Sequence, residues 1–150
     1  MILREMSKNG FLFSNDKRKL DVTYIHRFLS EQSYWAQGIP LHFVELSIQN
    51  SLCFAVFYNE KQVAFARVIT DSATFGYLAD VFVDEAHRGK GLSKQLMEFI
   101  LSFDDLKHLR RLILATKDAH SLYARFGFQP FKSPERFMEI HRPDIYKKIS

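Results

Sequence analysis

The chain has 150 residues, of which 47% are hydrophobic and 15% aromatic, so its length suits one domain with a sizeable core. The formal net charge is +4, but the basic residues are scattered along the chain and alternate with acidic ones. Because a nucleic-acid-binding domain would show a denser basic stripe or a reader motif, we expect no nucleic-acid partner. A modest positive field would suit a polyanionic small molecule.

The cysteine content and the hydropathy pattern indicate in which cellular compartment the protein is expected. The only cysteine, Cys53, rules out an internal disulfide and fits a reducing compartment. No stretch approaches the roughly 20 apolar residues of a membrane span, and residues 1–10 lack the apolar run of a secretory signal. The six histidines show no repeated Cys/His spacing, so we expect no metal site. These features predict a soluble, cytoplasmic protein whose residues 1–150 form a single domain.

The first third of the chain predicts two helices. A short extended segment at residues 11–13 precedes a helix that begins near Asp21, with apolar residues on one face. Glycine and proline mark a loop over residues 33–40, and Pro40 opens a second short helix.

The middle of the chain predicts a meander of strands. Residues 51–58, 62–69 and 74–83 have strand character and are joined by short turns, which is typical of antiparallel hairpins. A glycine loop then leads into an amphipathic helix, whose apolar positions are Leu92, Leu96, Phe99, Ile100 and Phe103.

The last third predicts a buried strand over residues 109–116 and a helix that Gly127 ends. Two short strands, near residues 128–131 and 136–141, complete the chain. The strand–helix–strand unit from Thr74 to Thr116 should make its two strands parallel. We therefore predict an α/β fold, with a mixed, mostly antiparallel sheet of about six to seven strands and about four flanking helices.

The glycine loop predicts an anion site. Gly89 and Gly91 stand directly before a helix, where unpaired backbone N–H groups and a partial positive charge favour an anion, and Arg88, Lys90 and Lys94 add positive charge. The alternative is an ordinary turn. The pattern is neither a P-loop nor a dinucleotide loop, because Ala86 and Lys94 occupy positions where those motifs need glycine.

Two motifs resemble those of a known family. Arg88-x-x-Gly91-x-Ser93, between a strand and a helix, is similar to the coenzyme A pyrophosphate loop of the GCN5-related N-acetyltransferases (GNAT). The stretch LYARFGF at residues 122–128 is similar to that family's Tyr-x-x-x-Gly-Phe. Ser93 departs from the usual Gly or Ala but is also small. Thr116 stands where many members have asparagine, and it can still cap a helix.

The resemblance implies that acetyl-CoA is the cofactor and that the acetyl group passes directly to an amine in a ternary complex. It implies that the pantetheine arm lies against the third strand of the meander and that the pyrophosphate lies in the glycine loop. The residues that it assigns to the cofactor are Val81, Phe82, Val83, Arg88, Gly89, Lys90, Gly91, Leu92, Ser93, Lys94, Thr116 and Ala119.

For catalysis, the resemblance points to Tyr123 as the proton donor to the leaving thiolate, because a phenol is protonated at neutral pH. The alternative is a tyrosine that packs in the core. Asp80 is the candidate that deprotonates or steers the amine, since related diamine acetyltransferases keep this aspartate, although Ala79 replaces their neighbouring glutamate. The alternative role for Asp80 is structural, as the ion-pair partner of Arg67.

The acceptor is expected to be a small-molecule primary amine or an amino-acid derivative. The candidate acceptor-binding residues are Tyr34, Trp35, Arg67 and His120; Trp35 could equally close the core, and His120 could lie on the surface. A protein or peptide amine is the alternative acceptor. A non-catalytic acyl-CoA-binding module is a further alternative function. A homodimer through the late strands or the first helices is also compatible with the resemblance.

Overall fold

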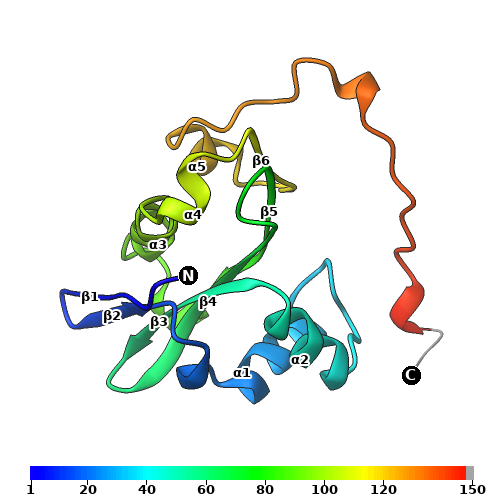
Figure 1. Cartoon of the computed structure of the whole chain (residues 1–150). Helices are drawn as coiled ribbons and strands as arrows, with labels where there is room; N and C mark the ends of the chain where they lie inside the picture. Colours follow the sequence, from blue (N-terminus) through cyan, green and yellow to red (C-terminus); the bar gives the residue numbers. More distant parts are fainter. Residues whose placement is uncertain (148–150) are drawn as a thin grey trace.

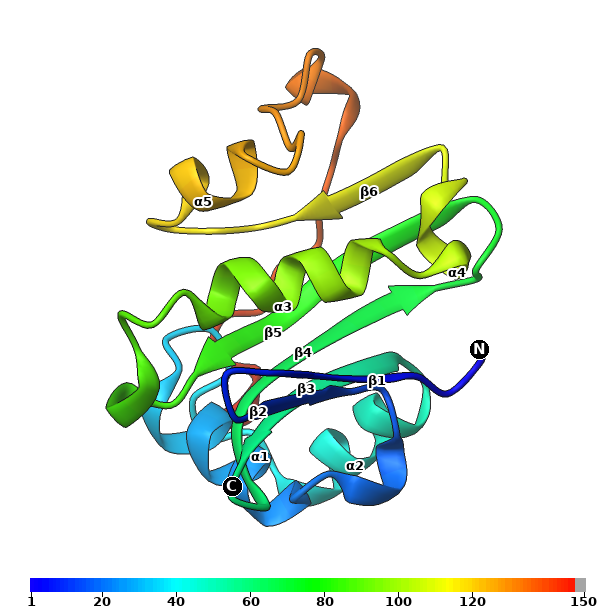
Figure 2. The ribbon, with the colours of Figure 1, turned by 90° about the vertical axis from the view of Figure 1, so that its left-hand side faces the viewer.

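The computed structural model describes residues 1–147 and contains a six-stranded sheet with the order β1-β2-β3-β4-β5-β6 (Figures 1 and 2). Strands β1 to β5 pair antiparallel, and β6 pairs parallel with β5, as the sequence predicts. The strands are β1 Glu5–Lys8, β2 Phe11–Ser14, β3 Leu52–Tyr58, β4 Lys61–Thr70, β5 Phe75–Val83 and β6 Arg111–Leu114.

Helices cover both faces of the sheet, so there are two apolar cores (Figures 1 and 2). Side chains alternate across β4: Ala64 and Ala66 face the core beneath α3, and Phe65 between them faces the core beneath α1 and α2. The α-helices are α1 Val22–Arg27, α2 Leu41–Gln49, α3 Leu92–Leu101, α4 Asp104–Lys107 and α5 His120–Ala124. No helix in residues 1–147 is long and apolar enough to cross a membrane.

The first predicted helix is shorter than its periodicity indicates. Asp21 caps α1 by accepting a hydrogen bond from the Tyr24 N–H at 3.0 Å, so the predicted start is correct. The α-helix ends at Arg27 and continues as one π-helical turn, Phe28–Gln32. Leu29 stays buried at 1% exposure, because the wider turn still directs it into the core.

Strand β1 was not predicted. It pairs with β2 through a tight turn at Asn9 and Gly10, which both have positive φ. The Asn-Gly pair is the sequence signal for this hairpin. All four residues of β1 are exposed, so the strand shows no apolar alternation.

The prediction of two late strands is wrong. Residues 128–131 and 136–141 form no strand, and Arg136 instead ends the 3₁₀ turn Pro134–Arg136. A strand needs a neighbouring strand to hydrogen-bond with, and in the single chain neither segment pairs with β6, the edge of the sheet. Residues 137–147 instead run clear of the sheet and return towards α2 (Figure 1), where the Tyr146 ring lies 6.3 Å from that of Phe43.

Candidate functional site

The strands β5 and β6 separate at the centre of the molecule. They pair over four positions, from Phe75↔Arg111 to Leu78↔Leu114, and β5 then continues to Val83 without β6 beside it, still paired with β4 on its other side. A β-bulge lies at the point of separation, because the β4–β5 register shifts between Phe65 and Arg67. The stretch of β5 beyond β6 carries all three residues that the family resemblance assigns to the pantetheine arm, Val81, Phe82 and Val83.

Within this stretch, the backbone edge can bind a ligand, whereas the Phe82 side chain cannot because it is buried. The Phe82 ring is buried and stacks on Phe28 with the ring centroids 3.8 Å apart, so this side chain belongs to the core. The β5 edge that faces the separation has no strand beside it. A linear ligand with amide groups could therefore pair there with the backbone, as an added strand would.

The glycine loop has the geometry of an anion site. Gly89 and Gly91 have φ of +78° and +76°, a conformation that side-chain-bearing residues rarely adopt. Gly91 is the N-cap of α3, and no side chain caps the first turn of that helix. A Cβ atom at Gly89 would meet no atom within 4 Å, and one at Gly91 would meet only the Gln95 Nε2 atom, at 3.7 Å. The N–H groups of the first turn have no acceptor within the helix and can bind an anion.

A cavity of about 280 Å³ lies at this loop. Arg88 is fixed beside it by a hydrogen bond of 3.0 Å from its Nε to the Val83 carbonyl, at the end of β5. Lys90, also predicted, does not line the cavity. The cavity is lined by Val83, His87, Arg88, Gly89, Gly91, Leu92, Ser93, Lys94, Leu122 and Arg125.

Three lining residues, His87, Leu122 and Arg125, were missed from the sequence. Leu122 and Arg125 lie within the LYARFGF motif, but which side of α5 faces the loop depends on how the helix packs. Arg125 adds a third cation to Arg88 and Lys94 at the cavity. Two buried polar atoms nearby, His87 Nδ1 and Gln95 Oε1, have no hydrogen-bond partner among the described residues. Unpaired buried polar atoms beside a cationic cavity are compatible with a polar ligand.

Thr116 and Ala119 form the turn that precedes α5. The Thr116 hydroxyl accepts a hydrogen bond of 3.0 Å from the Ala119 N–H, directly ahead of the helix. The N-cap of α5 is Ala119 and no side chain caps the helix, so the predicted capping by Thr116 is wrong; its hydroxyl instead closes the turn before the helix. The helix then presents Tyr123 on its buried side.

Tyr123 is 8% exposed and packs edge-on against Phe128, with ring centroids 5.9 Å apart. Burial, reinforced by the nearby Tyr34 and Asp118, raises the pKa of its phenol above the ordinary value. Tyr123 is therefore protonated at neutral pH and able to donate its proton. Its ring belongs to the apolar core beneath α3, as the packing alternative expected, and the phenol keeps its hydrogen-bonding capacity free among residues 1–147.

Asp80 lies in the bulge with φ of +54°, which is rare for a non-glycine residue. One carboxylate oxygen accepts from Trp35 Nε1 at 2.7 Å, and the other accepts from Arg67 Nε at 2.6 Å. The Arg67 and Asp80 side chains are only 16% and 9% exposed, and Arg67 also donates to Ser51 at 3.1 Å. The ion pair with Arg67 that the sequence offered as an alternative is therefore present.

The hydrogen bond between Trp35 and Asp80 ties the loop between α1 and α2 to β5, near the point where β5 and β6 separate. Trp35 is bonded to Asp80, and Tyr34 packs edge-on against Trp35 at 5.0 Å. From the segment after β6, the Lys117 ammonium lies 5.4 Å from the Tyr34 ring centroid. Trp35 is 42% exposed, so it is part of a surface wall and does not close the core.

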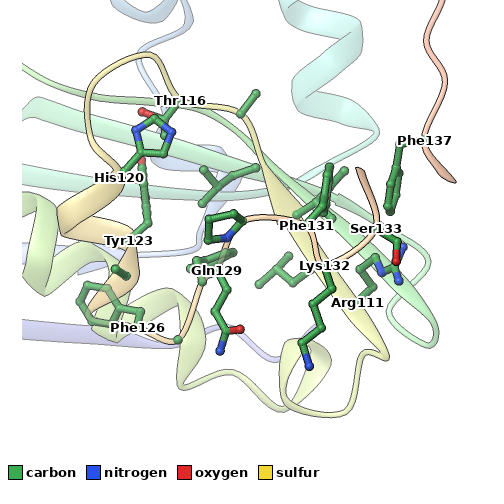
Figure 3. Close-up of a pocket in the computed structure, with 18 of the residues that line it drawn as sticks. Arg111, Thr116, His120, Tyr123, Phe126, Gln129, Phe131, Lys132, Ser133 and Phe137 are labelled. Atoms are coloured by element: carbon green, nitrogen blue, oxygen red, sulfur yellow. The ribbon is translucent and has the colours of Figure 1, made fainter. Parts of the chain in front are cut away.

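His120 lies on α5 at one end of a second, larger groove of about 1040 Å³ beside β6 (Figure 3). Thr116 and Tyr123 line the same end, while Phe131, Lys132 and Phe137 line the other. His120 is exposed and forms no hydrogen bond with Asp80, Trp35 or Arg67. Within the described chain, no group of three or more His, Cys, Asp or Glu side chains is placed to hold a metal ion.

Comparisons with known proteins agree with this geometry. Residues 49–130 match the model of the acetyltransferase (GNAT) domain. A crystal structure from Xanthomonas campestris pv. campestris, described as a "putative acetyltransferase" of the GNAT family, is 50% identical and covers 93% of this chain and 99% of its own, with a TM-score of 0.90. A "Putative acetyltransferase" of Gibberella zeae is 27% identical over 139 residues, covering 79% of this chain and 78% of its own.

A more distant structure from Deinococcus radiodurans, also described as a "putative acetyltransferase", is 15% identical, covers 93% of both chains and has a TM-score of 0.71. At that identity the likeness shows the fold alone. The family model spans more than half of the sequence and includes the glycine loop, the separated strands and Tyr123. The chain belongs to the GNAT acetyltransferase family.

Proposed function

We propose that the protein is an acetyl-CoA-dependent N-acetyltransferase whose acceptor is the primary amine of a small molecule or amino-acid derivative. The observation that carries the proposal is the cationic glycine-loop cavity, which lies next to the end of β5 where the edge towards β6 is open. A diphosphate and a linear amide-bearing arm would fit these two neighbouring features.

The residues fit the cofactor. Free N–H groups at the start of α3 and the side chains of Arg88, Lys94 and Arg125 would hold the pyrophosphate. The backbone of Val81 and Val83 would pair with the pantetheine amides. When bound, the cofactor supplies a thioester carbonyl that an amine can attack.

Tyr123 would serve the chemistry by donating its proton to the departing thiolate. Its raised pKa keeps the phenol protonated until a strong base forms beside it. Backbone N–H groups of β5 near Val81 would stabilise the oxyanion that develops during attack.

Asp80 is better suited to positioning than to proton abstraction, because both of its oxygens already accept hydrogen bonds and one of them is bonded to a guanidinium. We propose that it holds Trp35 and Arg67 in the acceptor wall. Tyr34 and His120 would border the acceptor on either side of the space between the separated strands β5 and β6.

Replacing Tyr123 with phenylalanine is expected to lower the rate of acetyl transfer about 100-fold, because a general acid contributes roughly that much or more. The affinity for acetyl-CoA should change little, since the ring remains. Thiol release from acetyl-CoA, measured against a panel of small amines and a lysine peptide, gives the rate, and calorimetry gives the affinity. A Tyr123→Phe enzyme with the full rate would remove the tyrosine from the mechanism. Binding of acetyl-CoA without transfer to any amine would favour the non-catalytic module.

Cys53 should not interfere with that thiol assay. It is 2% exposed, and burial raises the pKa of its thiol to about 11. The thiolate is the reactive form, so the native protein is expected to react with a thiol reagent at least about 100-fold more slowly than the denatured protein at pH 8. Mass spectrometry of the labelled protein measures the difference. Fast labelling of the native chain would show that the core around β3 opens readily.

A further inference from the structure

The guanidinium of Arg67 is held from two sides. Its Nε donates to the Asp80 carboxylate at 2.6 Å, and its Nη1 donates to the Ser51 hydroxyl at 3.1 Å. Ser51 is buried, and most of the Arg67 side chain is buried too, so the orientation of the guanidinium is fixed. A fixed, planar guanidinium presents its remaining N–H groups in one direction.

The second terminal nitrogen of this guanidinium, Nη2, is left without a partner. It donates no hydrogen bond to any of residues 1–147. It is also absent from the buried unpaired polar atoms of these residues, which are Tyr24 Oη, His87 Nδ1 and Gln95 Oε1, so solvent reaches it. Charged donors that are open to solvent on a mostly buried side chain can bind a hydrogen-bond acceptor of a ligand.

Two tyrosines lie near the Arg67–Asp80 pair. Arg67 pairs with Ala79, two residues after Tyr77, so Tyr77 is diagonal to Arg67 on the same face of the sheet. Tyr146 comes back to this face from the far end of the chain (Figure 1) and packs against the core beneath α1 and α2. Residues from β4, β5 and the C-terminal segment therefore meet at one place.

The two phenols are donors at neutral pH. Burial raises the pKa of Tyr77 and of Tyr146, the charge of Asp80 raises it further, and Arg67 lowers it. Both charges of the ion pair act on both phenols, which agrees with their place beside it. Neither phenol oxygen has a hydrogen-bond partner in the described part of the chain, and neither is a buried unpaired atom. Both O–H groups are therefore available to a ligand near the pair.

Asp80 determines which ligand group suits these donors. Its carboxylate already neutralises Arg67, so a second carboxylate bound at Nη2 would be repelled by Asp80. A neutral carbonyl oxygen accepts the same hydrogen bonds without that repulsion. Next to the pair, the exposed rings of Tyr34 and Trp35 offer a surface for an apolar or aromatic body.

We propose that Arg67 Nη2 and the phenols of Tyr77 and Tyr146 bind a neutral carbonyl oxygen of the acceptor, so that the acceptor is an amino-acid amide. The inference rests on the proposed function, because it assigns these donors to the acceptor of acetyl transfer. It gives Arg67 a direct contact with the substrate besides its ion pair, and it brings Tyr146 into the site.

Binding is tested with L-phenylalaninamide, L-phenylalanine and 2-phenylethylamine, which share an aromatic ring and an amine. Titrations with and without coenzyme A, followed by calorimetry and by the emission of Trp35, the only tryptophan, measure binding without acetyl transfer. Because the amines differ in basicity, the deciding comparison is between proteins. Arg67→Lys keeps the charge beside Asp80 but lacks Nη2, so the preference for the amide over 2-phenylethylamine should fall about 10-fold. Arg27→Lys, at an exposed position on α1, is the matched control and should keep the preference.

The double variant Tyr77→Phe, Tyr146→Phe covers the case in which Arg67→Lys does not fold. It keeps both rings and removes only the two phenol oxygens, and it should lower the same preference about 3-fold. An amide that does not bind to the native protein, or a preference that survives in every variant that folds, would overturn the proposal. L-Phenylalanine that binds more tightly than the amide would assign the donors to a carboxylate and would overturn it as well.

A separate assay of thiol release from acetyl-CoA distinguishes this proposal from the proposed function. Amide binding with the expected response to the variants, but without transfer to any amine, would support the carbonyl site and contradict the proposed function. Transfer to amines that neither variant redirects away from the amide would contradict the carbonyl site alone.

Discussion

Replacing Ser93 with aspartate is expected to weaken acetyl-CoA binding by about 100-fold without unfolding the protein. Ser93 lies in the first turn of α3 and lines the glycine-loop cavity. A negative charge a few ångströms from a bound diphosphate would cost about 2.7 kcal/mol, which corresponds to that factor. The same charge interacts favourably with the N-terminus of α3, so the free energy of unfolding should rise by about 0.3–1 kcal/mol.

The opposite signs of the two effects make this variant informative. Calorimetric titration measures the affinity, and denaturant unfolding measures the stability. Ser93→Ala is the matched control, and we expect it to bind within a few-fold of the native affinity, because a small residue keeps the backbone accessible. If Ser93→Asp binds acetyl-CoA as tightly as the native protein, the diphosphate does not lie at the start of α3.

The second large effect is expected at Asp80. Asp80→Ala leaves the Arg67 guanidinium, which is 16% exposed, without its ion-pair partner and removes the acceptor of the Trp35 N–H. Removing one member of a buried pair costs about 3 kcal/mol, and we expect that loss in the free energy of unfolding. Trp35 is the only tryptophan, so its emission should also shift to longer wavelength as the loop detaches.

Comparing Asp80→Gly with Asp80→Ala distinguishes the loss of the side-chain contacts from the strain of the backbone conformation. Glycine loses the same contacts but adopts the φ of +54° at little cost, so it should be about 1 kcal/mol more stable than Asp80→Ala. Chemical unfolding of both variants measures the difference. Equal stability would show that the bulge relaxes when the side chain is removed. A native-like stability of both variants would show that the Trp35–Asp80–Arg67 network does not fasten the loop.

Local patterns predicted most of the fold. The strands β3, β4 and β5 and the helix α3 were found because their apolar periodicity and turn residues lie close together in the sequence. The glycine loop was found for the same reason. The early end of α1 was not found, because Phe28 and Leu29 keep a helical apolar pattern through the π turn.

Features that depend on distant partners could not be predicted in this way. Residues 136–141 were predicted to form a strand, but a strand exists only where a neighbouring strand pairs with it, and none does among residues 1–147. Arg125 lines the cavity because of how α5 packs against the loop, which the sequence alone does not indicate. The positive φ of Asp80 could not be predicted either, since the sequence around it has the pattern of an uninterrupted strand.

Calorimetric titration of the unmodified protein with acetyl-CoA tests most directly whether this GNAT fold binds acetyl-CoA. We predict saturable binding at one site per chain, through the cavity formed by Arg88, Ser93 and Lys94. A folded protein that gives no binding heat at several temperatures and does not change its thermal stability with acetyl-CoA would contradict the account.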